Sequence, residues 1–356
     1  MKKLRLAIIG QGRSGRDIHG IFYTCEENKW FEVAYVAELD PFRRERAEKE
    51  YPGCVAVADY REFLTKKDID LVVNDTYSDT HYSITKEFLE AGFNVLVEKP
   101  FARTYYECCD LMRIAKEKGV VLAVFQQTFL APYYVKAREL VESGIIGDVK
   151  QVSIRFNGFA RRWDWQTLQS KVAGGVYNTG PHPIGLALAF LDFDEYARVE
   201  YSKLDSVLTS GDSDDYAKII LSAPGKPVVD VEVSSIDAFS DYTLKIQGSR
   251  GTFKCKGKNY KIKYIVDGEN PEQPLIVESL KDEEGNPIYC RENLITHEEE
   301  GTVGGTAFSV AVRDFYAALY KTITEDAPMP VTAEMAARII NVIEIAHAQN
   351  PLPVKY

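Results

Sequence analysis

The chain has 356 residues, which is enough for about two domains that each bury a core of their own. Its formal net charge of −10 and the lack of a long basic block argue against nucleic acid and anionic membranes as partners, so we expect a small-molecule ligand. The sequence shows no signal peptide, no apolar run of roughly 20 residues and no metal-binding cysteine spacing, so we expect a reduced, cytoplasmic protein without a metal site.

The first predicted element is an apolar strand over residues 6–9 that runs into Gly10-x-Gly12-x-x-Gly15. Gly10 permits a tight turn, Gly12 lets the backbone approach a pyrophosphate, and Gly15 lets the following helix pack closely. The start of that helix offers free N–H groups and a partial positive charge to an anion. A plain glycine turn is the alternative, but the position directly after a buried strand favours a dinucleotide-binding loop.

Up to about residue 125, strand-like apolar runs alternate with helix-like segments. Further strands are predicted over residues 31–38, 54–57, 71–74, 94–97 and 120–125, and helices over residues 41–50, 80–91 and 105–118. Gly92 and Gly119 mark the ends of the last two helices. The alternation predicts a parallel, doubly wound sheet, so residues 1–125 are expected to form an NAD-binding Rossmann domain.

Glu38 ends the second predicted strand, 23 residues beyond Gly15. A carboxylate near that distance can accept both hydroxyls of the adenosine ribose and repels a 2′-phosphate, so we expect NAD as the cofactor and disfavour NADP. A solvated glutamate at a strand end is the alternative. Arg43 and Arg44 follow closely and are the residues that could reverse the preference.

Glu98 and Lys99 follow the fifth predicted strand and precede Pro100. Ligands of open parallel sheets bind beyond the carboxyl ends of the strands, so both side chains should emerge at the cofactor cleft. A lysine at this place can hydrogen-bond a substrate oxygen and stabilise charge as it develops. A surface ion pair between Glu98 and Lys99 is the simple alternative.

From residue 126 onward the pattern changes. A helix is predicted over residues 132–143 and a turn over 144–147, and strands follow at residues 149–156, 196–201, 216–221, 228–235, 242–247, 252–255 and 260–266. Strands in succession predict an α+β domain over residues 126–356 with a large, open, mainly antiparallel sheet. Residues 267–304 are predicted as long surface loops, in which His297 and the glutamates after it form a solvated acidic run. Structural helices are predicted over residues 307–324 and 332–348.

The segment 159–182 carries the remaining candidate chemistry. It holds two tryptophans, Trp163 and Trp165, among Arg161, Arg162 and Asp164, then a Gly174-Gly175 hinge, and it ends in Asn178-x-Gly180-x-His182. Two tryptophans beside charged groups suit a carbohydrate, although both could equally pack as a lid. His182 is the best candidate acid or base, because its ordinary pKa of about 6.5 lets it accept a proton from an alcohol near neutral pH. A structural histidine is the alternative.

Three features together, Gly10-x-Gly12-x-x-Gly15, Glu98-Lys99-Pro100 and the segment 174–182, resemble the glucose-fructose oxidoreductase and inositol dehydrogenase (Gfo/Idh/MocA) family. The resemblance covers nearly the whole chain. It implies an oxidoreductase whose second domain commonly forms a dimer through its open sheet, with Lys99 and His182 in catalytic roles. Asn178 stands where the family usually has aspartate, so it can orient a hydroxyl but cannot hold a proton. Gln126-Gln127 stands where many relatives have Asn-Arg.

We therefore expect an NAD-dependent dehydrogenase acting on CH–OH groups, which transfers a hydride between nicotinamide and a secondary alcohol of a sugar, polyol or glycoside. The alternatives are a redox-assisted glycoside lyase or hydrolase with recycled NAD and a non-catalytic NAD-binding sensor. We expect a homodimer or homotetramer that forms through the sheet of the C-terminal domain. The expected catalytic residues are Lys99, Asn178 and His182. The expected cofactor-binding residues are Gly10, Gly12, Arg13, Ser14, Gly15, Glu38, Thr76, His81, Glu98 and Lys99. The expected substrate-binding residues are Lys99, Arg161, Trp163, Trp165, Asn178 and His182.

Overall fold

The computed structural model describes residues 2–356, and the first of its two large sheets is entirely parallel. Its strands lie in the order β3-β2-β1-β4-β5-β6. They span β1 (Leu4–Ile9), β2 (Phe31–Ala37), β3 (Val55–Val57), β4 (Leu71–Asn74), β5 (Val95–Val97) and β6 (Leu122–Val124). The central strands are continuous apolar runs, as a sheet covered on both faces requires. The predicted doubly wound sheet is confirmed.

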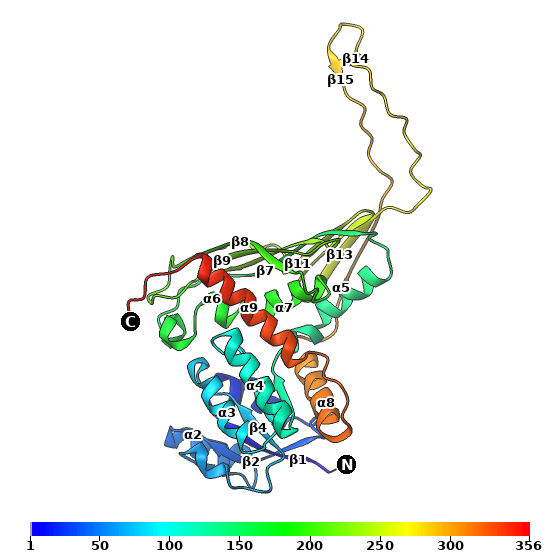
Figure 1. Ribbon diagram of the computed structural model, residues 1–356. Coiled ribbons are helices and arrows are strands. Elements are labelled where there is room, and N and C mark those ends of the chain that lie inside the picture. The colour runs from blue at the N-terminus through cyan, green and yellow to red at the C-terminus, as the bar shows by residue number, and fades with distance from the viewer. Residues whose placement is uncertain (1) are drawn as a thin grey trace.

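Helices cover both faces of this first sheet (Figure 1). One face packs against α3 (His81–Glu90) and α4 (Tyr105–Lys118), and the other against the π-helix η1 (Arg13–Gly20), α1 (Ile21–Thr24) and α2 (Pro41–Glu50). A capping box of Thr104 and Glu107 begins α4, and Gly119 ends it at a φ of 65°. Short 3-10 helices span η2 (Tyr60–Phe63), η3 (Ser78–Thr80), η4 (Gln127–Leu130), η5 (Trp165–Thr167) and η6 (Gln169–Lys171).

The second large sheet has eight strands in the order β16-β13-β12-β11-β7-β10-β9-β8. They span β7 (Val149–Asn157), β8 (Arg198–Asp205), β9 (Tyr216–Ser222), β10 (Val228–Ser234), β11 (Leu244–Gly248), β12 (Gly251–Lys256), β13 (Asn259–Tyr264) and β16 (His297–Thr302). Only β7 and β10 pair in parallel, and the other neighbours are antiparallel. The prediction of a mainly antiparallel sheet is confirmed.

Helices lie on one side of the second sheet, and Figure 1 shows its other side uncovered. The covering helices are α5 (Pro132–Glu142), α6 (Gly175–Asn178), α7 (Pro181–Phe190) and α9 (Ala333–Gln349). The strands alternate between buried apolar residues toward the helices and polar residues toward the uncovered side, as in β9 with its pattern of buried Ala217, Ile219 and Leu221.

The helix α8 (Val310–Glu325) returns to the first sheet, although it lies near the end of the chain. Phe315 and Tyr316 on α8 are fully buried in the same apolar cluster as Leu6 and Ile8 of β1. The helix α9 then contacts α4 of the first half and α7 of the second. The domain boundary at residue 125 stays a prediction, and the core around the first sheet includes residues from the far end of the sequence.

The prediction of surface loops over residues 267–304 is wrong at its end, where β16 forms an edge strand of the second sheet. The acidic residues of β16 stand opposite lysines of β13, so that Glu298 pairs with Lys263 at 3.4 Å and Glu300 with Lys261 at 2.5 Å. These cross-strand pairs let an acidic run form a strand. The preceding residues form a long projection that ends in the small hairpin of β14 (Leu280–Lys281) and β15 (Pro287–Ile288) (Figure 1).

Across residues 2–356, none of the helices combines the length and the apolar character needed to cross a membrane.

Candidate active site

The glycine turn after β1 has the shape that a dinucleotide pyrophosphate requires. Gly10 has a φ of 98°, and a Cβ there would lie 2.6 Å from the carbonyl oxygen of Asp75. A Cβ on Gly15 would lie 2.1 Å from the carbonyl oxygen of Gly10, whereas Gly12 faces open space. Arg13 and Ser14 then begin the helix η1, whose first turn has no side-chain cap. The free N–H groups of this turn and the open side at Gly12 fit a pyrophosphate.

Glu38 lies directly after β2 and beside the glycine turn. Its Oε2 accepts a hydrogen bond from the main-chain N–H of Gln11 at 2.7 Å. The guanidinium of Arg44 is engaged by main-chain carbonyls, including that of Glu38 at 2.6 Å, whereas Arg43 Nη1 lies 3.8 Å from Oε2 of Glu38. The carboxylate is therefore placed where an adenosine ribose would be recognised in this fold, with one arginine close to it.

A buried group of ionisable residues lies beneath the turn. Nε2 of His19 lies 3.1 Å from Oε1 of Glu98 and 3.2 Å from Oδ1 of Asp75, and its Nδ1 bonds the hydroxyl of Tyr316 at 2.6 Å. Burial raises the pKa of Asp75 to about 7. Burial opposes ionisation of Glu98 as well, but the hydrogen bond with His19 and the charge of Lys99 lower its pKa to about 2.

Two predicted cofactor residues hold the neighbouring loops together. The hydroxyl of Thr76 donates to Oδ1 of Asn74 at 2.7 Å. Nδ1 of His81 bonds the carbonyl oxygen of Pro100 at 2.6 Å, and its other ring nitrogen lies 3.3 Å from the carbonyl oxygen of Thr76. The buried His81 ring thus connects the loop after β4 with the loop after β5, and its contact with a cofactor stays a prediction.

Lys99 emerges at the carboxyl end of β5, as the parallel sheet requires. Its Nζ donates a hydrogen bond to the main-chain carbonyl of Asn178 at 2.9 Å. This bond connects the first half of the chain to the second. Burial lowers the pKa of Lys99, and the charges of Arg13 and Arg162 lower it further, while Glu98 opposes them. The surface ion pair between Glu98 and Lys99 is excluded, because Glu98 is 4% exposed and directs its carboxylate to His19 and to the main-chain N–H of Lys99.

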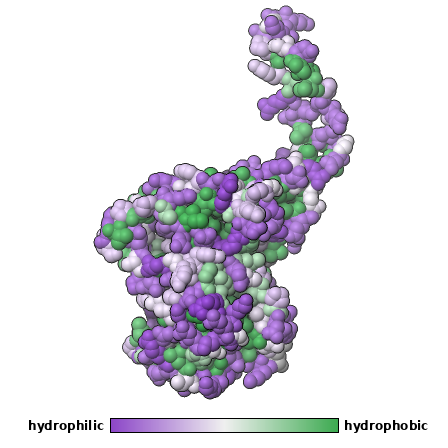
Figure 2. All heavy atoms as spheres, viewed as in Figure 1, coloured by the Kyte–Doolittle hydropathy of each residue, from purple (hydrophilic) through white to green (hydrophobic). Residues whose placement is uncertain are grey.

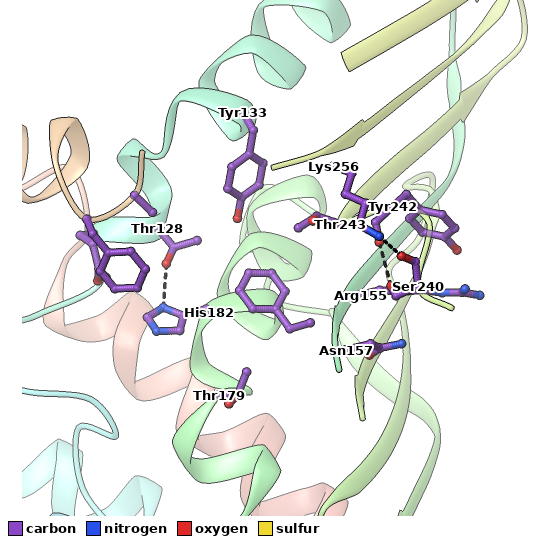
Figure 3. Close-up of a pocket in the computed structure, with 14 residues that line it drawn as sticks. Thr128, Tyr133, Arg155, Asn157, Thr179, His182, Ser240, Tyr242, Thr243 and Lys256 are labelled. Carbon is purple, nitrogen blue, oxygen red and sulfur yellow. Dashed lines mark hydrogen bonds between the residues drawn. The ribbon is translucent and has the colours of Figure 1, made fainter. Parts of the chain in front are cut away.

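His182 is the second residue of the helix α7 and lies close enough to Lys99 for the lysine's charge to affect it. Its Nδ1 lies 2.7 Å from the hydroxyl of Thr128, as Figure 3 shows, and its ring stacks on Phe156 at 6.3 Å between centroids. Burial lowers the pKa of His182 to about 3, and the charge of Lys99 contributes to this shift. The imidazole is therefore neutral at pH 7. When Nδ1–H donates to Thr128, Nε2 carries a free lone pair. The lowered pKa makes this nitrogen a weaker base than the histidine with an ordinary pKa of about 6.5 that the sequence led us to expect.

A cavity of about 460 Å³ opens beside His182. Its polar lining comes from η4, α5, β7 and two loops, and it includes Gln127, Thr128, Tyr133, Asn157, Thr179 and Tyr242. Three side-chain oxygens among them have no hydrogen-bond partner in the described part of the chain, namely those of Gln127, Tyr133 and Asn157. A cavity of this size with unpaired polar groups suits a small polar ligand.

Lys99 donates to the main-chain carbonyl of Asn178, and its charge acts on His182. Of the predicted substrate residues, His182 alone lines the cavity among residues 2–356. Arg161 and Trp163 are exposed, and Trp165 packs edge-on against Tyr77 of the first half at 4.8 Å. Trp163 and Trp165 line a separate cavity of about 340 Å³. Trp165 therefore packs against the first half of the chain, as the alternative of a lid suggested. Substrate binding by Arg161, Trp163 and Trp165 stays a prediction.

Sequence reasoning missed Thr128, which contacts His182, and Tyr133, which lines the same cavity. The signal that could have found Thr128 is its position just beyond the carboxyl end of β6, where the crevice of a parallel sheet lies. Tyr133 sits in the first turn of α5 and reaches the cavity only through the packing of that helix on the second sheet, so no local pattern marks it.

Two family models match the chain. The first model describes an oxidoreductase family with an NAD-binding Rossmann fold and matches residues 4–126. The second describes the GFO/IDH/MocA C-terminal domain and matches residues 134–254. The chain is 26% identical to the uncharacterized oxidoreductase YdgJ of Escherichia coli (strain K12) over 352 residues, which cover 96% of this chain and 95% of that protein.

A second relative has an activity in its name. It is the scyllo-inositol 2-dehydrogenase (NADP(+)) IolW of Bacillus subtilis (strain 168), 24% identical over 349 residues that cover 96% of this chain and 92% of that protein. Among solved structures, GenD2 from gentamicin A biosynthesis in complex with NAD has a TM-score of 0.76 at 19% identity, and the match covers 100% of this chain and 97% of that one. This structural likeness shows the shared fold.

Proposed function

Because the chain belongs to the Gfo/Idh/MocA family of oxidoreductases and begins with an NAD-binding Rossmann domain, we propose that it oxidises or reduces a small sugar or polyol at a secondary alcohol. The observation that carries this proposal is the position of Lys99 and His182. One follows a strand of the first sheet, the other begins a helix of the second half, and a bond from Lys99 Nζ to the carbonyl oxygen of Asn178 connects the two segments.

The roles of these side chains follow from their protonation. When bound, the dinucleotide supplies the acceptor or donor of the hydride. Lys99 holds the substrate oxygen through its ammonium group and stabilises negative charge on it. His182 is neutral at pH 7 and takes the hydroxyl proton at Nε2, while Thr128 fixes the ring through Nδ1. Asn178 acts through its main-chain carbonyl, which positions Lys99, so a charged aspartate is not required for that contact.

Support for a polyhydroxylated substrate comes from the cavity and from one relative. The unpaired oxygens of Gln127, Tyr133 and Asn157 can accept hydrogen bonds from substrate hydroxyls. IolW, by its name, acts on an inositol. Absence of net NADH formation with cleavage of a glycosidic bond would instead favour the redox-assisted lyase, and binding without turnover would favour the sensor.

We also propose that this chain prefers NAD, because the Glu38 carboxylate beside the glycine turn would repel a 2′-phosphate. The name of IolW includes NADP(+), and Arg43 is the residue here that could accept such a phosphate. Fluorescence titration of the purified protein should accordingly give tighter binding of NADH than of NADPH.

The proposed activity is tested by measuring initial rates with NAD and a panel of inositols, aldoses and sugar acids. Lys99→Ala and His182→Ala should each lower kcat by around 10² to 10⁴, the usual range for a positioned proton-transfer group, with NADH binding nearly intact. The double variant should be scarcely slower than the worse single one if the two residues act as a unit. Lys116→Ala, which removes an exposed lysine of α4, is the matched control. A near-normal rate for His182→Ala would make this histidine structural.

A further inference from the structure

The loop between β8 and β9 contains four consecutive polar residues that are all buried. Asp212, Ser213, Asp214 and Asp215 are only 2%, 1%, 1% and 8% exposed. Carboxylates ordinarily lie at the surface, and the surface seen in Figure 2 is mostly hydrophilic. Three buried carboxyl groups in one short loop therefore need partners that compensate for the loss of water. We call residues 212–215 the acidic loop.

Two of the three carboxyl groups hold neighbouring backbone in place. Asp215 accepts hydrogen bonds from the main-chain N–H groups of residues 207–209, at 2.6 to 2.7 Å. Asp212 accepts one from the main-chain N–H of Gln169 at 2.9 Å and one from that of Lys355 at 2.8 Å. These bonds hold a turn, the helix η6 and the end of the chain, which accounts for both side chains.

Asp214 instead bonds to the segment that leads to His182. Its main-chain carbonyl accepts from the N–H of Gly175 at 2.7 Å, and its Oδ2 accepts from the N–H of Val176 at 2.7 Å. These are the first two N–H groups of the one-turn helix α6, and they have no partner within the helix. Gly174 precedes α6 and has no side chain to cap it, so Asp214 supplies the missing cap.

The contact between Asp214 and α6 is close. Gly174 has a φ of 113°, and a Cβ there would overlap Oδ1 of Asp214, so glycine leaves the room that the carboxyl group occupies. This Oδ1 has no hydrogen-bond partner within residues 2–356, and Nε2 of His347 lies beyond hydrogen-bond distance at 3.9 Å. Among these residues, the bond to Val176 is therefore the one hydrogen bond that the carboxyl group makes.

The other end of α6 holds Lys99. The main-chain N–H of Asn178 closes the single turn onto the carbonyl oxygen of Gly174 at 2.9 Å, and the carbonyl oxygen of Asn178 accepts from Lys99 Nζ at 2.9 Å. A single helical turn is not stable by itself, so the contacts at its two ends determine where it lies. A carboxyl group at the first N–H groups and an ammonium group at the last carbonyl both suit the helix dipole.

We propose that Asp214 is a positioning residue for the reaction, because it fixes α6 and, through α6, the carbonyl oxygen of Asn178 that directs the ammonium group of Lys99. It acts through the main chain of residues 175–178 and is not a catalytic residue. The inference rests on the proposed function, since it explains how Lys99 is held where it can reach the substrate oxygen.

The first test compares two substitutions of Asp214 by initial rates at saturating NAD. Asp214→Ala removes the bond to Val176 and should lower kcat by about 10- to 100-fold, because a misplacement of roughly 1 Å can cost that much. Asp214→Asn keeps an oxygen that can accept the same N–H and should retain most of the rate. NADH binding should stay nearly unchanged in both. Asp205→Asn, at a half-exposed side chain of β8, is the matched control and should behave like the unaltered protein.

Thermal unfolding shows whether each variant is folded. A normal rate for folded Asp214→Ala, or an equally low rate for Asp214→Asn, would overturn the proposal. If Asp214→Ala does not fold, Gly174→Ala tests the same contact from the opposite side, because its Cβ would displace the carboxyl group. A normal kcat in folded Gly174→Ala would overturn the proposal as well.

The second test measures the placement of Lys99 without any turnover. Acetic anhydride acetylates free amines, and mass spectrometry gives the rate at Lys99 relative to the exposed Lys116 of α4. In the unaltered protein Lys99 should react more slowly than Lys116, because its Nζ donates to the carbonyl oxygen of Asn178. The ratio should rise several-fold in Asp214→Ala and stay close to that of the unaltered protein in Asp214→Asn.

The two measurements separate this inference from the proposed function. An unchanged acetylation ratio in Asp214→Ala would overturn the positioning role even if the protein oxidises a sugar. The expected ratios in a protein that turns over no substrate of the panel would instead refute the proposed function and leave the effect of Asp214 on Lys99 established.

Discussion

Asp75 holds a buried carboxyl group directly under the turn that fits a pyrophosphate. Its Oδ2 lies 3.3 Å from the position that a Cβ on Gly15 would take. Neither oxygen accepts a hydrogen bond within residues 2–356, because the ring N–H of His19 is directed to Glu98. His19 and Glu98 are the charged groups that face Asp75, and the hydroxyls of Tyr23, Tyr51 and Tyr316 complete its surroundings.

This arrangement predicts that cofactor binding depends on pH. The pKa of Asp75 is raised to about 7, and a bound pyrophosphate would disfavour its charged form further. Below about pH 6 the carboxyl is protonated with or without the ligand, so affinity for NADH should be constant there. As the pH rises through 7, binding requires uptake of a proton and affinity should fall. Fluorescence titration of NADH between roughly pH 5.5 and pH 9 measures the effect.

Asp75→Asn is the matching variant, because it removes the charge and keeps the shape. It should bind NADH several-fold more tightly than the unaltered protein at high pH and lose the pH dependence. Asp17→Asn, which neutralises an exposed carboxylate on the same helix η1, should leave the pH dependence unchanged. Equal pH profiles for the unaltered protein and Asp75→Asn would refute the coupling.

Thr128 is predicted to position His182. In Thr128→Val the ring loses its hydrogen-bond partner at Nδ1 and with it the contact that fixes its orientation, so kcat should fall by about 10- to 100-fold with little change in KM. Thr128→Ser retains the hydroxyl and should retain most of the rate. Because the pKa of His182 is about 3, this histidine is almost fully neutral at roughly two pH units above that value. The rate of the unaltered enzyme should therefore begin to fall only below about pH 5. Equal rates for the valine and serine variants would contradict this role.

At the scale of elements, α8 completes the core of the first sheet. Phe315 is fully buried and packs edge-on against Phe125 at 5.0 Å. Phe315→Ala should therefore destabilise the protein by about 3 to 5 kcal/mol, as for other buried phenylalanines. Chemical denaturation followed by tryptophan fluorescence measures the decrease in the free energy of unfolding. Phe42→Ala, at a side chain 69% exposed on α2, is the control and should cost little. A small loss at Phe315 would mean that α8 is only loosely held.

The sequence predicted the elements well where a local pattern determines them. Pro41–Glu50 and Tyr105–Lys118 form helices with the predicted bounds, because their caps and apolar spacing are local. It failed at β16, where a strand of glutamates depends on lysines of β13 more than 30 residues earlier. Lys99 and His182 could be proposed from motifs. Thr128 meets His182, and Tyr133 reaches the cavity beside it, only through the packing of separate elements.

At the scale of the whole molecule, the cleft depends on how the two halves are held together. Lys171 pairs with Asp79 at 2.8 Å, and Arg103 donates to the carbonyl oxygen of Ser170 at 2.9 Å. These contacts and the helix α9 set the distance between the strand end that carries Lys99 and the helix that carries His182. Half-exposed ion pairs are weak by themselves, so most of this rigidity comes from the apolar packing of α9.

The return of α8 to the first sheet affects how the protein is made. The chain emerges from the ribosome in order, and 185 residues lie between the end of β6 and the start of α8. At about 5 to 20 residues per second, the first sheet waits roughly 10 to 40 seconds for the helix that covers one of its faces. During that interval Phe31, Phe125 and their neighbours have no cover from α8. The nascent chain therefore offers a binding site to chaperones that recognise exposed apolar strands, and this site disappears when translation ends.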